Sequence, residues 1–119
     1  MNTKQTSAQD SSIADYQFII EEIDYMIAST TQLRESLNTV CQRQLAFPNK
    51  ELEKIRVGCR HQFHKIREFK HLLGNWRIEL RFVPYKTEIK DYLFLLDDLE
   101  SQTSTNVQLA AKLAEAKVS

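Results

Sequence analysis

Glycine and proline are scarce in this chain of 119 residues, which has two of each. Because these residues supply most tight turns, such low numbers argue against an all-β protein built from many short strands. The two glycines are also too few for the glycine-rich loops that bind phosphates or dinucleotides. The composition therefore favours a helical fold without a nucleotide-binding loop.

Long apolar runs are missing as well. No run approaches the roughly 20 residues that a membrane-spanning helix needs. The polar segment 1–12 lacks the apolar centre of a secretory signal. The two cysteines, Cys41 and Cys59, do not have the spacing of a metal site, and both fall on apolar stripes, so we expect buried, reduced thiols. These features predict a cytoplasmic protein with no membrane span.

The chain carries no charge of one sign in excess, since sixteen basic side chains balance sixteen acidic ones. Hydrophobic residues make up 42% and charged residues 27%, as in ordinary globular proteins. We predict one helical-bundle domain over residues 12–117. Residues 1–11 should form a disordered N-terminal arm, because Thr, Gln, Ser and Asn offer nothing to bury.

Apolar residues recur every three or four positions over most of the chain, which predicts amphipathic helices. The first helix should begin at Ser12 and end before Pro48. The second should have Asn49 as its N-cap and end at Pro84, where the third begins. Short connections make successive helices antiparallel neighbours. The predicted fold class is all-α, a three-helix up-down-up antiparallel bundle with long helices.

Two segments allow alternatives. Trp76, Ile78, Leu80 and Phe82 alternate with charged residues, which is a strand-like pattern. We favour helix there, because the sequence offers no partner strand. Residues 101–106 are poor helix formers, so the third helix either continues through them or breaks, and a short fourth C-terminal helix then begins near Thr105.

Several aromatic residues lie beside the apolar stripes. Phe18 and Tyr25 are one heptad apart on the flank of the first helix, and Phe94 has a similar place on the third. The second helix reaches the same height near Leu72 and Trp76. These rings either complete the core or form an exposed apolar surface. We predict that Phe18, Tyr25, Leu72, Trp76 and Phe94 bind a protein partner or a second copy of the chain.

The second helix has an excess of basic side chains, among them Arg60, Lys65 and Arg67. A basic helix can bind nucleic acid through its phosphates, and this is the alternative function. The basic residues are scattered around the helix, however, and no helix-turn-helix motif is present. Attraction to the acidic first helix is the better explanation of these charges, so nucleic acid is the second choice of partner.

One polar face of the second helix carries His61, His64, Glu68 and His71. A single convex helix face cannot surround a metal ion, so we predict a solvated face, no metal site and no cofactor. No sequence motif of a catalytic nucleophile is present, and we expect no enzyme activity. The predicted function is that of a non-enzymatic interaction protein, such as an adaptor, chaperone, inhibitor or complex subunit.

Overall fold

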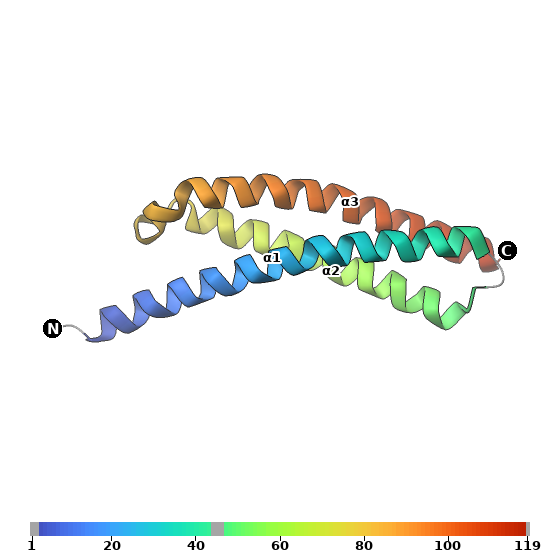
Figure 1. The fold of residues 1–119 in the computed structure, drawn as a ribbon, viewed down its shortest axis with the longest axis horizontal. Coiled ribbons are helices and arrows are strands. Elements are labelled where there is room, and N and C mark those ends of the chain that lie inside the picture. Colours follow the sequence, from blue (N-terminus) through green and yellow to red (C-terminus); the bar gives the residue numbers. More distant parts are fainter. Residues whose placement is uncertain (1–2, 44–46, 119) are drawn as a thin grey trace.

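A computed structural model describes the backbone of residues 3–43 and 47–118 and the side chains of residues 14–43 and 47–116. Its elements are α1 (Thr3–Arg43), α2 (Asn49–Trp76), the 3₁₀ helix η2 (Leu80–Tyr85) and α3 (Lys86–Val118) (Figure 1). The three α-helices run up, down and up along a rod of 67 × 24 × 19 Å. The described residues contain no strand, and the predicted all-α three-helix bundle is confirmed.

Helix α1 is the longest element, with 41 residues. It begins at Thr3 rather than at Ser12, so most of the segment expected to be a disordered arm is helical. The division of the chain into an arm and a domain stays a prediction. The N-terminal part of α1 diverges from α2 and α3 (Figure 1). The predicted end of this helix before Pro48 falls partly on residues 44–46, which lie outside the described residues.

Helix α2 begins at Asn49, one residue earlier than it would if Asn49 were its N-cap. The N-cap is Pro48, whose ψ of 134° is extended and whose carbonyl accepts a hydrogen bond from the Leu52 N–H at 3.1 Å. No side chain caps this end, so the prediction for Asn49 was wrong. Glu51 lies in the first turn, where a negative charge interacts favourably with the helix dipole.

Both interpretations of residues 76–83 were wrong, since this connection is neither a continuous helix nor a strand. After Trp76 the backbone turns, and the Phe82 N–H donates to the Glu79 carbonyl at 3.1 Å, an i to i−3 bond typical of a 3₁₀ helix. Trp76 and Phe82 are both buried and stack with their ring centroids 4.8 Å apart. A continuous α-helix would place these residues about 120° apart around its axis, on different faces.

Helix α3 continues through residues 101–106, so the alternative with a short fourth helix was wrong. Thr103 and Asn106 in this segment are buried in the bundle. Tertiary packing therefore compensates for their weak helix propensity.

The core consists of two apolar clusters with a layer of buried polar side chains between them. We call the cluster at the η2 end the aromatic cluster; it includes Tyr16, Ile23, Ile66, Phe69, Leu73, Trp76, Phe82, Ile89 and Leu96. The aliphatic cluster near the α1–α2 connection is centred on Leu37, Cys59 and Ala110. The polar layer contains Thr30, Gln62, Thr103 and Asn106.

The two cysteines have different surroundings. Cys59 is buried in the aliphatic cluster, and burial raises the pKa of its thiol. Cys41 is exposed, so the expectation that both thiols are buried was wrong for Cys41. The neighbouring α1 residues Leu37 and Val40 are buried, so Cys41 lies just outside the part of the α1 stripe that faces the core.

Candidate functional site

Three of the five predicted partner-binding residues are exposed. Phe18, Tyr25 and Phe94 have exposed fractions of 58%, 73% and 65%. Leu72 is half-buried against the aromatic cluster, and Trp76 is buried within it. Trp76 therefore contributes to the core and offers little exposed area to a partner.

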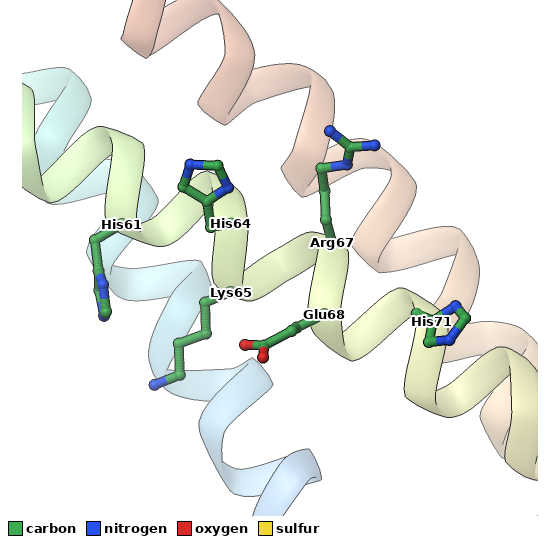
Figure 2. Close-up of a pocket in the computed structure, with 6 residues that line it drawn as sticks. All are labelled: His61, His64, Lys65, Arg67, Glu68 and His71. Carbon is green, nitrogen blue, oxygen red and sulfur yellow. The ribbon is translucent and has the colours of Figure 1, made fainter.

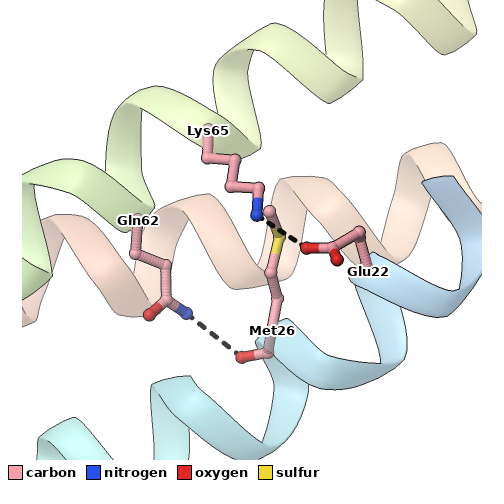
Figure 3. Close-up of polar contacts among 4 residues, drawn as sticks. All are labelled: Glu22, Met26, Gln62 and Lys65. Carbon is pink, nitrogen blue, oxygen red and sulfur yellow. Dashed lines mark hydrogen bonds and ion pairs between the residues drawn. The ribbon is translucent and has the colours of Figure 1, made fainter. Parts of the chain in front are cut away.

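The structure places the exposed aromatic residues on opposite sides of α2. Glu22, on the same flank of α1 as Phe18 and Tyr25, pairs with Lys65 of α2 at 2.6 Å (Figure 3). Phe94 shares a groove with Lys70 of α2. Lys65 and Lys70 are about 140° apart around the α2 axis. The five predicted residues thus do not form one surface, although they lie toward the same end of the rod.

The rings around Trp76 fix the position of η2. The Tyr16 ring lies 6.2 Å from Trp76, 6.0 Å from Phe82 and 4.9 Å from Tyr85, measured between centroids. The Tyr16 hydroxyl donates a hydrogen bond to the Glu88 carboxylate at 2.6 Å. Burial, this hydrogen bond and the nearby negative charge raise the pKa of Tyr16. Helices α1, α2 and α3 all contribute to the support of this segment.

The connection between α2 and α3 exposes three aliphatic side chains that the sequence analysis did not select. Ile78 and Leu80 have exposed fractions of 83% and 88%, and Val83 is exposed beside them. They line a hollow of about 490 Å³ together with Arg77 and Lys86. The alternating pattern at 76–82 was the available signal: two of its apolar residues face inward, and two face solvent.

A groove of about 330 Å³ between α2 and α3 adjoins this hollow. It is lined by Arg77 from the end of α2 and by Lys90 and Phe94 from α3, among others. Arg77 lines both features, so they form one continuous surface. We call it the connector surface; it comprises Arg77, Ile78, Leu80, Val83, Lys86, Lys90 and Phe94.

The three residues predicted for nucleic-acid binding differ in their exposure and in whether they form an ion pair. Arg60 and Arg67 are exposed, and the Arg67 guanidinium lies 5.8 Å from the centroid of the Phe63 ring. Lys65 is half-buried and paired with Glu22, so part of its charge is neutralised. In Figure 2 Lys65 and Arg67 point to different sides of α2. Of the three predicted residues, only Arg60 and Arg67 are both exposed and on the same side of α2, so only these two could contact phosphates together.

The histidine face of α2 lines a broad, open hollow (Figure 2). The side chains of His61, His64 and His71 point in different directions and do not converge on one position. Among the described side chains of residues 14–43 and 47–116, no three from His, Cys, Asp or Glu are grouped so that they could hold a metal ion.

Compared with protein-family models, with curated proteins and with solved structures, the chain has no match in any of the three. Among the described residues, no helix has the length and apolar character required to cross a membrane. A function is therefore inferred from the exposed side chains of this structure.

Proposed function

We propose that this chain is a non-enzymatic interaction protein that binds a protein partner through the connector surface. The observation that carries the proposal is the almost complete exposure of Ile78 and Leu80. Aliphatic side chains in a short connection between helices are normally covered or replaced by polar ones. Groups of them that stay in water commonly belong to interfaces.

The support beneath these side chains strengthens the proposal. Phe82 lies in the same segment, is buried and stacks on Trp76. The backbone that carries Ile78, Leu80 and Val83 is therefore held in place before a partner arrives. A preorganised surface loses little conformational entropy on binding, which favours affinity.

The proposal includes the role of an adaptor, chaperone, inhibitor or complex subunit in the cytoplasm. Both cysteines are free thiols, which suits a reducing compartment. A second copy of the chain is another candidate partner, and Phe18 and Tyr25 on α1 are the side chains that would contact it.

Affinity capture from a native lysate tests the proposal when wild type is compared with an Ile78→Ser/Leu80→Ser double variant. We expect a defined set of proteins with wild type, unaffected by nuclease, and loss of that set with the double variant. Val57→Ser is the matched control, because Val57 is also an exposed aliphatic residue but lies on α2 away from the connector surface. Identical recovery with all three proteins would contradict the proposal.

Self-association through α1 is tested separately by sedimentation velocity of wild type and a Phe18→Ser/Tyr25→Ser variant. A dimer of wild type that dissociates in the variant, with unchanged thermal stability, would identify a second copy as the partner. A monomeric wild type would exclude this form of the proposal.

Nucleic acid is the second candidate partner, favoured by the exposure of Arg60 and Arg67, which are one heptad apart on α2. Binding through them would weaken steeply with salt and would be lost in an Arg60→Glu/Arg67→Glu variant. We expect no binding to duplex DNA or RNA at physiological salt, as measured by fluorescence anisotropy.

A further inference from the structure

The connector surface combines its apolar side chains with three exposed cations, Arg77, Lys86 and Lys90. Within the part of the chain that the structure describes, none of the three takes part in an ion pair. This surface therefore carries positive charge that the chain itself leaves without a counterion.

The two carboxylates that line this surface, Glu79 and Asp97, are already in ion pairs. Glu79, which lines the hollow, accepts from Arg81 at 2.6 Å. Asp97, which lines the groove, pairs with Lys70 at 2.6 Å, and this contact raises the pKa of Lys70. The charge that remains for a partner to neutralise is positive.

We propose that the connector surface binds an acidic, amphipathic helical segment of a protein partner. The apolar side of such a segment covers Ile78, Leu80, Val83 and Phe94, and its carboxylates interact with the three cations. This inference rests on the proposed function and names the chemistry of the partner at the same surface.

The spacing of the side chains on α3 fits a helical partner. Lys86, Lys90 and Phe94 follow one another at intervals of four residues, which places them about 6 Å apart along the axis. Acidic residues one turn apart in a helix repeat at about 5.4 Å. Two carboxylates on successive turns can therefore lie opposite Lys86 and Lys90 at the same time, while an apolar residue reaches Phe94.

The shape and chemistry of the surface favour a peptide over a bilayer or a nucleic acid. Phe94 and Lys90 lie in a groove between α2 and α3, which the side chains of a docked helix can fill better than a flat bilayer can. Phosphates can pair with the three cations, but a nucleic-acid backbone offers no apolar side chains to cover Ile78, Leu80 and Val83.

Three labelled peptides of about 20 residues test the proposal by fluorescence anisotropy. The first has Leu at helical spacing and Glu elsewhere, the second has Lys in place of Glu, and the third is the scrambled acidic sequence. We expect the acidic amphipathic peptide to bind at least about tenfold more tightly than either control, and more weakly as salt rises from about 50 to 200 mM.

Variants of the full chain locate the binding site. Lys86→Glu/Lys90→Glu and Ile78→Ser/Leu80→Ser should each weaken binding of the acidic peptide by about tenfold or more. Arg60→Glu and Val57→Ser, which change matched exposed residues elsewhere on α2, should leave it within about twofold. Circular dichroism checks the fold of each variant, and glutamate at position 86 in the first turn of α3 and at the exposed position 90 in the second turn should not disturb that helix.

Equal binding of the acidic and basic peptides would overturn the inference, as would equal weakening by the control variants. So would binding only to anionic vesicles, measured by co-sedimentation with phosphatidylserine-containing and purely zwitterionic vesicles. The two proposals can be distinguished. If capture of proteins depends on Ile78 and Leu80 but not on Lys86 and Lys90, the proposed interaction role stands and the acidic partner is wrong.

Discussion

The end of the bundle that carries η2 and the end near the α1–α2 connection have cores of different composition. At the η2 end, large rings from α1, α2 and η2 pack around fully buried aliphatic residues. At the other end, Leu37, Cys59 and Ala110 are surrounded by side chains that are only partly buried. The larger of the two apolar clusters thus lies beneath the connector surface, and we expect the larger share of the packing energy there.

The polar layer separates these two regions and fixes how the helices align. Gln62 of α2 donates to the Met26 carbonyl of α1 at 3.1 Å (Figure 3) and also to the Thr30 hydroxyl. Arg34 of α1 donates to Asn106 of α3 at 2.6 Å. A shift of α1 along the bundle would break these bonds and leave polar groups buried without partners, which is costly.

The largest expected difference between the two ends of the bundle comes from truncating one buried leucine side chain at each end, in separate variants. Leu73 and Leu37 are both completely buried, and Leu73→Ala should lower the free energy of unfolding by about 3–5 kcal/mol. Leu37→Ala should cost about 2–3 kcal/mol, because its partly buried neighbours can move into the cavity. Urea denaturation followed by circular dichroism measures both. Asn38→Ala, at an exposed position, is the control, and equal losses at Leu73 and Leu37 would remove the difference between the regions.

The next test breaks the polar layer. Asn106→Ala should lower the free energy of unfolding by about 1.5 kcal/mol, because the partly buried Arg34 loses its acceptor. The gain in helix propensity offsets only part of this loss. Gln108→Ala on the exposed side of α3 serves as the reference in the same urea titration. An Asn106→Ala protein as stable as this reference would show that the layer does not hold α1 to α3.

A smaller effect concerns Tyr16 in the aromatic cluster. Its pKa is raised above the ordinary value of about 10, so the folded state favours the neutral phenol. The stabilisation is complete below about pH 10 and is lost as the pH rises further. Tyr16→Phe should cost about 1 kcal/mol at pH 7 and progressively less above pH 10.

Urea denaturation between pH 7 and pH 11 measures this difference. Some pH dependence should persist in the Tyr16→Phe variant, because burial and the nearby carboxylate of Asp24 also raise the pKa of Tyr92. At pH 7 the exposed control Tyr25→Phe should be as stable as wild type. A constant difference between wild type and Tyr16→Phe at every pH would contradict the assigned role of the Glu88 hydrogen bond.

The smallest expected effect is a gain in stability on removal of the Thr103 hydroxyl. The hydroxyl of Thr103 is buried and, among the described residues, has no hydrogen-bond partner. Thr103→Val keeps the shape of the side chain and removes this group, so thermal denaturation should show a stabilisation of about 0.5–1 kcal/mol. A loss of stability would mean that the hydroxyl is hydrogen-bonded, for example to a buried water molecule. Ser101→Ala, on the exposed side of α3, corrects for helix propensity.

The helical stripes made the architecture predictable. Ile23 and Ile66, which lie on the apolar stripes of the first two helices, are both completely buried. The connection at 77–85 was not predictable, because its course depends on the stacking of Phe82 on Trp76, a contact that exists only once the helices are packed. For the same reason the sequence did not show that Trp76 faces inward while Ile78 and Leu80 face solvent.

The polar layer was missed because Thr103 and Asn106 were interpreted only as weak helix formers. A signal was available: each occupies a position where the apolar stripe of α3, running from Leu99 to Ala110, would otherwise continue. A polar residue at a core position, matched by Thr30 and Gln62 on the other helices, indicates a buried hydrogen-bonded layer. Its pairing could not be derived without the register of the helices.

The length of α1 has a mechanical consequence. The helix begins at Thr3, whereas its contacts with the aromatic cluster begin at Tyr16 among the described side chains, so the part that precedes them is a lever of about 20 Å. Helix α1 as a whole packs less extensively against its neighbours than α2 and α3 pack against each other. A tilt of about 10° at Tyr16 would displace the tip of this lever by about 3 Å.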